Sequence, residues 1–424
     1  MSTGIELRTN LSRAVLPESS EPQLLYVLLE AVPQGAVTTL PKLPLNLCLV
    51  IDRSSSMRGD RLYQVKEAAH RIIDQMGDDD YFALVTFNDR AEVVIAAQKV
   101  RNKADLKHLV STVEAAGGTE MANGLALAVQ EIQRPMLRQS ISRMLLLTDG
   151  RTYGDEGRCV EITRRAQSRG VGLNAIGIGH EWNEDLLETM AARENSRTQY
   201  ITTASEIAAV FADELKRMHS VFAQGVKFRI EVRPGGMLRS FDRVRPFLTN
   251  VPIMEEKELC WVAATGDWPS SDTQAFLLEL MVPPLAAGEH PLMRLALNYT
   301  QPGASGADQR ADSVLRISVR PSAAVTKEVD ATVKHWLERL VAYRLQSSAW
   351  QDVEAGRIED ATRRLQMAGT RLFEAGETEL ARTVQDEATR LLRSGQATSE
   401  GRKRIKYGTR GLMGGGDHSQ EAGA

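Results

Sequence analysis

Two hydroxyl groups follow a carboxylate at alternating positions near residue 50 of the chain. Asp52, Ser54 and Ser56 come directly after an apolar run, Leu45–Ile51, whose length suits a buried strand. The carboxyl ends of parallel strands are the places where ligands bind in open α/β sheets. Carboxylate and hydroxyl oxygens suit hard cations such as Mg²⁺, which keeps several waters and needs no all-protein cage. The segment therefore predicts a divalent-cation site at a sheet edge.

Two later segments supply further oxygen donors of the same kind. Thr119 follows a Gly-Gly pair and precedes a helical pattern, and Asp149 ends a second apolar run that begins at Leu145. If both runs are parallel strands of one sheet, their ends meet at the same edge. Neutral hydroxyls beside few carboxylates leave a divalent cation under-neutralised, so a carboxylate from another protein can complete its shell.

Together these residues form Asp-x-Ser-x-Ser, a distant Thr and a more distant Asp. The constellation resembles the metal-ion-dependent adhesion site of von Willebrand factor A domains, over about residues 44 to 220. The resemblance implies that Ser54, Ser56 and Thr119 contact the ion and that Asp52 and Asp149 act directly or through water. It implies Mg²⁺, with Mn²⁺ or Ca²⁺ as alternatives, and a partner protein that supplies an acidic residue. An isolated Asp-x-Ser-x-Ser more often forms a turn or caps a helix, but the matching Thr and second Asp favour the cation site.

The absence of familiar catalytic motifs from the sequence favours a binding function over catalysis. A strand-end aspartate can act as a nucleophile, so a metal-dependent phosphohydrolase that uses Asp52 is one alternative. Such enzymes carry an Asp-x-Asp motif, however, and in this chain Ser54 stands where the motif has its second Asp. No Gly-x-Ser-x-Gly, His-Glu-x-x-His or Walker A pattern occurs. A structural subunit with a silent metal site is the other alternative. We expect a non-catalytic adaptor in an intracellular bacterial signalling or assembly system.

Composition limits the partners and the location of this chain. The 424 residues suggest two or three domains, and a net charge of -3 gives no electrostatic case for nucleic acid. Three cysteines are too few for a disulfide framework or a zinc site. The first residues show no basic segment followed by an apolar one, and no run approaches the roughly 20 apolar residues that span a bilayer. We therefore expect a cytoplasmic protein with no membrane span.

The order of strand and helix patterns predicts three structured regions. Strands and helices alternate through residues 44–221, which predicts an α/β fold with a doubly wound, mostly parallel sheet and one antiparallel edge strand. Residues 1–43 and 222–322 carry strand patterns separated by Pro and Gly turns. We expect them to form one discontinuous β-sandwich into which the α/β domain is inserted. Residues 324–395 read as helices, either a tetratricopeptide-like hairpin or a plain hairpin packed on the sandwich.

The last segment, residues 396–424, is polar and rich in glycine. Such a composition cannot bury enough apolar area to order itself, so a disordered tail is expected. The tail contains a basic cluster at 402–410. That cluster is either solvated chain or a docking motif, phosphorylated at Thr409 and bound by a phospho-Thr-binding domain.

Overall fold

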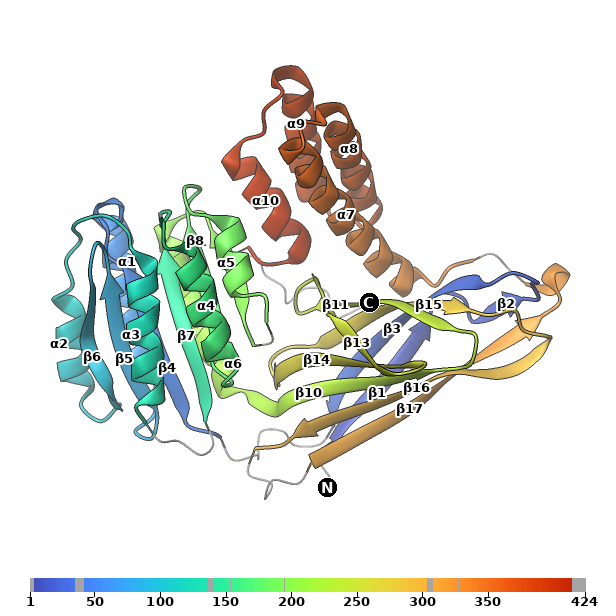
Figure 1. Cartoon of the computed structure of the whole chain (residues 1–424), viewed down its shortest axis with the longest axis horizontal. Helices are drawn as coiled ribbons and strands as arrows, with labels where there is room; N and C mark the ends of the chain where they lie inside the picture. Colours follow the sequence, from blue (N-terminus) through green and yellow to red (C-terminus); the bar gives the residue numbers. More distant parts are fainter. Residues whose placement is uncertain are drawn as a thin grey trace. The chain divides into compact units, whose positions relative to one another are not determined.

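A computed structural model describes residues 4–34, 42–135, 140–152, 154–193, 195–302, 308–325 and 328–413. The end of the predicted tail, 414–424, lies outside the described residues. The described residues form two compact units. Residues 42–221 together with 412–413 form one, which we call the α/β unit. Residues 4–34 together with 222–411 form the other, which we call the sandwich unit (Figure 1).

The α/β unit contains the predicted doubly wound sheet. Its strands are β4 (Leu45–Asp52), β5 (Tyr81–Phe87), β6 (Ala91–Lys99), β7 (Ile141–Thr148), β8 (Gly172–Ile178) and β9 (Arg197–Ile201). They lie in the order β6-β5-β4-β7-β8-β9, and all neighbours pair in parallel except β5 and β6. The predicted fold class and the single antiparallel edge strand are confirmed.

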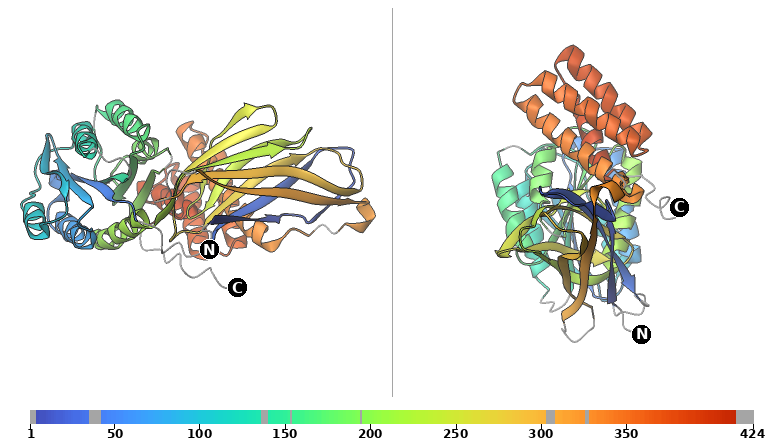
Figure 2. Two further views of the ribbon diagram at one scale, coloured as in Figure 1. Left: turned by 90° about the horizontal axis from the view of Figure 1, so that it is seen from below. Right: turned by 90° about the vertical axis from the view of Figure 1, so that its right-hand side faces the viewer.

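Helices lie on both sides of this sheet (Figure 2, left). They are α1 (Asp60–Gln75), α2 (Lys103–Ser111), α3 (Met121–Gln133), α4 (Glu156–Gln167), α5 (Glu184–Met190) and α6 (Ile207–His219), with short 3-10 turns η2 (Ser55–Met57) and η3 (Ala204–Glu206). Helices α1, α2 and α6 share one hydrophobic core with alternate residues of β4, and α3 to α5 pack together on the opposite side. Every residue of β4 is buried, as expected for a central strand covered on both faces.

The end of β4 lies where the strand order of the sheet reverses. The chain passes from β4 to β5 on one side and reaches β7 on the other, so the order reverses at β4. Loops that leave neighbouring strands in opposite directions open a ligand crevice at their carboxyl ends. Asp52 is the last residue of β4, and Asp149 directly follows β7. The topology thus brings together two residues that are 97 positions apart in the sequence.

The sandwich unit is built from two sheets. One contains β1 (Gly4–Leu11), β3 (Gln23–Gln34), β15 (Gln274–Val282), β11 (Met237–Arg245) and β12 (Thr249–Asn250), in that order. The other contains β13 (Ile253–Lys257), β14 (Cys260–Pro269), β10 (Val221–Val232), β16 (Gly288–Thr300), β17 (Asp308–Arg320) and β2 (Val15–Pro17). The two N-terminal strands expected from the sequence, β1 and β3, complete the first sheet, since β3 pairs with β15. Strand β2 pairs with β17 in the second sheet. The sequence analysis did not anticipate β2, β12 and β13, which have only two to five residues each.

Four helices complete the sandwich unit: α7 (Ala331–Glu354), α8 (Ile358–Glu374), α9 (Thr378–Ser394) and α10 (Ser399–Arg410), after a 3-10 turn η4 (Ser322–Ala324). Helix α7 packs Trp336 and Leu340 against Leu28 and Leu277 on the outer face of the first sheet. The sequences of β3 and β15 are apolar on both faces because both faces are covered. Within the described ranges, no helix is long and apolar enough to cross a membrane.

The prediction of a disordered tail from residue 396 is wrong for α10. The side chain of Thr398 caps the helix by accepting a 2.9 Å hydrogen bond from the N–H of Gly401, and Glu387 of α9 accepts from Thr398 in turn. A Cβ atom on Gly408 would lie 2.7 Å from Leu380 of α9. Gly408, which contributed to the glycine-rich composition, therefore allows α10 to pack closely against α9.

Thr409 is not the exposed phosphorylation site that the sequence suggested. Its side chain is buried, and its hydroxyl donates to the backbone carbonyls of Ile405, at 2.9 Å, and Lys406, at 3.1 Å. A kinase needs this hydroxyl free and accessible. The prediction of an accessible phosphorylation site at Thr409 is therefore wrong, because α10 buries the face that carries this residue.

Candidate metal site

The carboxylate of Asp52 is fully buried at the end of β4. Its Oδ1 accepts a 2.8 Å hydrogen bond from the backbone N–H of Ser54, and its Oδ2 accepts a 2.7 Å hydrogen bond from the hydroxyl of Thr148. Thr148 is the last residue of the neighbouring strand β7. Two adjacent strands therefore fix the orientation of this carboxylate.

A chain of hydroxyl groups links the loop after β4 to Asp149. The Oγ atoms of Ser54 and Ser56 are 3.0 Å apart, and Ser56 donates a 2.7 Å hydrogen bond to Oδ1 of Asp149. Met57, at the end of η2, is buried in the core and anchors this loop. Ser54 and Asp149 are buried, whereas Ser56 is exposed to solvent. Four of the five predicted residues thus lie in one hydrogen-bonded group that reaches the surface.

Thr119, the fifth residue, lies on a loop that is tied to the loop after β4. Both the N–H and the hydroxyl of Ser55 donate 3.0 Å hydrogen bonds to the carbonyl of Gly117. Gly117 has φ +81°, and any Cβ atom there would collide with the carboxylate of Asp89, so only glycine suits this turn. The Oγ1 of Thr119 is 3.7 Å from the position that a Cβ atom on Gly150 would take. Its hydroxyl is therefore beside the residue that follows the second aspartate.

The sequence analysis missed two residues that contact these aspartates. One is Thr148, which orients Asp52. The other is Arg61 in the first turn of α1, whose Nη1 donates to Oδ2 of Asp149 in a close ion pair. Thr148 could have been found, because a hydroxyl at a strand end beside a predicted ligand is a recognisable signal. Arg61 carried no such signal, since an arginine in a first helical turn is common.

Burial dominates the electrostatics of the site. Burial raises the pKa of Asp52 to about 6, hydrogen bonds from Thr148 and Ser54 oppose the rise, and the negative charge of Asp149 adds to it. Two neighbouring buried carboxylates are costly without positive charge close by. The guanidinium of Arg61 supplies such a charge to Asp149. The arrangement therefore favours a cation at the end of β4 and β7.

The donor set fits a hard divalent cation. It consists of two carboxylates and three hydroxyls, which are the oxygen ligands that Mg²⁺, Mn²⁺ and Ca²⁺ prefer. Among the residues that the structure describes, no three His, Cys, Asp or Glu side chains gather into a metal-binding group. The site therefore depends on hydroxyl ligands, and that composition disfavours soft metals.

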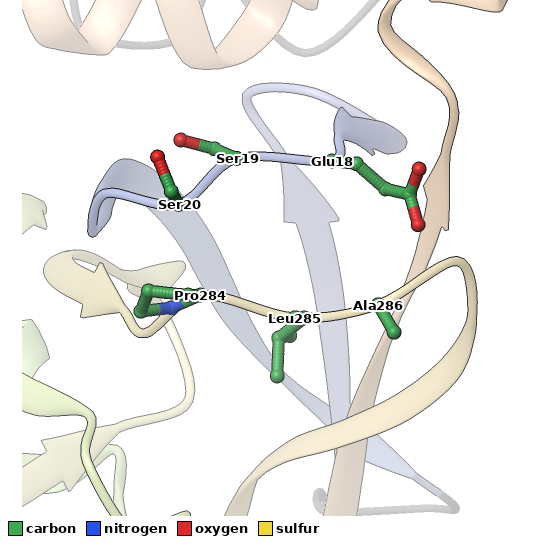
Figure 3. Close-up of a pocket in the computed structure, with 6 residues that line it drawn as sticks. All are labelled: Glu18, Ser19, Ser20, Pro284, Leu285 and Ala286. Carbon is green, nitrogen blue, oxygen red and sulfur yellow. The ribbon is translucent and has the colours of Figure 1, made fainter.

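A shallow pocket in the sandwich unit does not resemble a second site. It lies between the β2–β3 and β15–β16 loops and is lined by Glu18, Ser19, Ser20, Pro284, Leu285 and Ala286 (Figure 3). The carboxylate of Glu18 is already bonded, because its Oε1 accepts a 2.7 Å hydrogen bond from the N–H of Ala287. Glu18 thus joins the two loops that form this pocket.

Known proteins resemble the chain in each of its units. A family model described as the von Willebrand factor type A domain matches residues 46–213, and one described as the Sll0103-like, C-terminal alpha-helical domain matches residues 331–415. The solved structure of a von Willebrand factor type A protein from Catenulispora acidiphila matches 96% of this chain and 97% of its own, with a TM-score of 0.78 and 18% identity. Inter-alpha-trypsin inhibitor heavy chain H1 of Bos taurus is 32% identical over 177 residues, which are 39% of this chain and 20% of that protein. The α/β unit is thus a von Willebrand factor type A (VWA) domain.

The similarity to one bacterial protein extends through most of the chain. Protein sll0103 of Synechocystis sp., which is named as uncharacterized, is 31% identical over 364 residues, or 85% of this chain and 86% of that protein. The present chain belongs to the family of sll0103, a family of VWA proteins with a C-terminal helical domain. Binding of a metal by the five residues stays a prediction.

Proposed function

We propose that the VWA domain binds a divalent cation, Mg²⁺ first among the candidates, and uses it to hold a carboxylate of a partner protein. Ser54, Ser56 and Thr119 would hold the ion through their hydroxyls. Asp52 and Asp149 would balance its charge, Asp52 from a buried position. The bound ion would supply an open coordination position that attracts an acidic side chain. The protein would then act as a non-catalytic adaptor, and the cytoplasmic location expected from the sequence stays a prediction.

The observation that carries this proposal is the hydrogen-bonded group formed by Asp52, Ser54, Ser56 and Asp149. These side chains come from two strand ends that the topology brings together, and Ser56 opens the group to solvent. Family membership supports the same interpretation, because VWA domains often mediate protein–protein interactions. A hydroxyl-rich group with two buried carboxylates has no evident structural purpose that apolar residues would not serve better.

Catalysis by Asp52 is a weaker interpretation of the same geometry. An aspartyl nucleophile needs a carboxylate oxygen directed at its substrate. Both oxygens of Asp52 accept hydrogen bonds within the protein, and the side chain is fully buried. The position suits charge balance better than attack on a phosphate ester.

Calorimetric titration of the full chain with Mg²⁺, Mn²⁺ and Ca²⁺ tests the proposal. We expect saturable binding of one ion by the wild type and loss of that binding in Asp52→Ala. Asp78→Asn is the matched control, because Asp78 is an exposed aspartate in the α1–β5 loop of the same domain and its loss should change affinity by less than about twofold. Absence of binding by the wild type at millimolar concentrations of all three ions would refute the proposal. A partner captured in Mg²⁺ by the wild type and lost with Asp52→Ala would then identify the protein that supplies the acid.

A further inference from the structure

Arg61 lies where it can compete with a metal ion for its ligands. Its Nη1 donates to Oδ2 of Asp149 and, at 3.4 Å, to the backbone carbonyl of Ser56. Its Nη2 lies 3.6 Å from the position that a Cβ atom on Gly179 would take, so the guanidinium also contacts the loop after β8. The arginine thus joins the start of α1 to two of the residues that we propose as ligands.

The ion pair satisfies a buried carboxylate. The side chain of Asp149 has no exposed area, whereas that of Arg61 is 39% exposed. Oδ1 of Asp149 accepts from Ser56 and Oδ2 accepts from Arg61, so both carboxylate oxygens have donors. Without the arginine, Asp149 would share a buried region with Asp52 and lose the closest positive charge in contact with it. Such an unpaired buried charge is strongly destabilising.

A divalent cation and the guanidinium cannot both occupy this position at low cost. An ion held by Ser56 and Asp149 would bring like charges within a few ångströms of each other in a largely buried region, where repulsion is strong. Arg61 has a direct route away, because its side chain is long and partly exposed. Ser56, the ligand beside it, is exposed as well.

We propose that Arg61 is a displaceable counter-cation: it neutralises Asp149 in the metal-free VWA domain and swings into solvent when a divalent cation binds. This inference rests on the proposed metal site and deepens it, because it makes cation binding an exchange of one positive charge for another. Because Arg61 must be displaced first, the cation binds more weakly than it would bind to the same ligands without the arginine. It also keeps the metal-free domain folded, so that the site can respond to a change in cation concentration.

Substitution of Arg61 separates these two effects. In Arg61→Gln, Mn²⁺ and Mg²⁺ should bind at least about fivefold more tightly than in the wild type, as measured by calorimetry, because a coupling of this kind between two sites is typically about 5- to 150-fold. In EDTA the same variant should melt at a lower temperature than the wild type, and Mn²⁺ should reverse the difference. Arg61→Lys keeps the charge without the planar fork and should fall between the two in both measurements.

Arg58→Gln is the matched control for the loss of one positive charge. Arg58 is exposed at the end of the same loop, so its removal changes the local field without touching Asp149. Arg61→Gln that binds Mn²⁺ no more tightly than Arg58→Gln would overturn the inference, while binding by the wild type would leave the proposed metal site standing. Failure of the wild type and of all three arginine variants to bind any ion would refute both. Binding by Arg61→Gln at ion concentrations too low to occupy the wild type, which then binds only at higher concentrations, would support the inference.

Discussion

Thr148, on the strand next to β4, orients the carboxylate of Asp52 through a single hydroxyl group. Its Oγ1 donates a 2.7 Å hydrogen bond to Oδ2 of Asp52 and lies 3.3 Å from the N–H of Gly150. Thr148 and Asp52 are both buried, so no solvent replaces a lost bond. The hydroxyl therefore fixes the direction of the carboxylate and favours its charged form against the effect of burial, which raises the pKa of Asp52.

We expect Thr148→Val, which keeps the shape of the side chain and removes its hydroxyl, to weaken the VWA domain in two ways. Loss of the donor should lower the free energy of unfolding by about 1–3 kcal/mol, the usual cost of leaving a buried acceptor unsatisfied. Mg²⁺ affinity should also fall, because Asp52 loses its fixed orientation. Urea denaturation of the full chain in EDTA and calorimetry with Mg²⁺ measure the two effects. Thr148→Ser should restore most of both, and a valine variant with unchanged stability and affinity would contradict this role.

The sequence predicts much of the site at this scale, and the remainder depends on the folded backbone. Asp52, Ser54 and Ser56 are close in sequence, so their alternation is visible without a structure. Thr119 and Asp149 were found after a Gly-Gly pair and at the end of a second apolar run, and the family resemblance then supported their assignment to one site. Arg61 could not be identified in the same way, because its pairing with Asp149 depends on how α1 begins above the end of β7. The position of the start of α1 relative to β7 is set by packing, which the local sequence does not encode.

At the scale of elements, Asp80 joins three segments at the other end of the central strands. Its carboxylate accepts hydrogen bonds from the N–H of Leu45, at 2.8 Å, the N–H of Gly77, at 2.8 Å, and Nε2 of His219, at 3.1 Å. These residues start β4, follow α1 and end α6, respectively. Burial alone would raise the pKa of Asp80, but hydrogen bonds from His219, Leu45 and Gly77 outweigh it and hold the pKa below its usual value.

This lowered pKa predicts a stability contribution that depends on pH. The unfolded chain takes up the proton first as the pH falls, so the contribution is complete above an unfolded pKa of about 3.9 and is lost as the pH falls through the folded value. Asp80→Asn should therefore cost about 1–3 kcal/mol of unfolding free energy at pH 7, and the difference from the wild type should shrink below pH 4. Urea denaturation between pH 7 and pH 3 measures it. Asp78→Asn, an exposed neighbour, should follow the wild type; a cost for Asp80→Asn that stays constant with pH would refute the assignment.

Elements whose burial follows from their own sequence were predicted, and those that depend on distant partners were not. The apolar runs of β4 and β7 and the helical spacing of α1 mark these elements in any context. Helix α10 differs, because most of its residues are polar and its Ile405 is buried through packing with α7, α8 and α9. Strand β2 likewise has three residues and exists through its pairing with β17. Composition alone could not distinguish such segments from disordered chain.

At the scale of the whole molecule, the chain returns to the VWA domain after completing the sandwich unit. It leaves the domain at Val221, and Leu412 and Met413 belong to it again. The carbonyl of Leu412 accepts a 3.1 Å hydrogen bond from the N–H of Tyr200, and Met413 forms a parallel bridge with the same residue. Tyr200 lies on β9, an edge strand of the VWA sheet. This segment therefore covers part of an edge that would otherwise present unpaired backbone groups.

Leu412 is buried, although it lies 191 positions after Val221, where the chain leaves the VWA domain. Truncation of its side chain should therefore affect β9, which is distant in the sequence. Leu412→Ala should lower the free energy of unfolding of the domain by about 2–5 kcal/mol, as for other buried leucines, and should speed amide hydrogen exchange at Tyr200, whose N–H bonds to residue 412. Hydrogen-exchange mass spectrometry of the full chain measures the effect on peptides that contain β9.

Leu392→Ala is the control, since Leu392 is 58% exposed on α9 and the same truncation there should leave β9 unchanged. Exchange at Tyr200 that is equally slow in both variants would show that β9 holds its edge without the returning segment. Faster exchange with Leu412→Ala alone would instead show that residues 412–413 stabilise the VWA domain, although they are distant from it in the sequence.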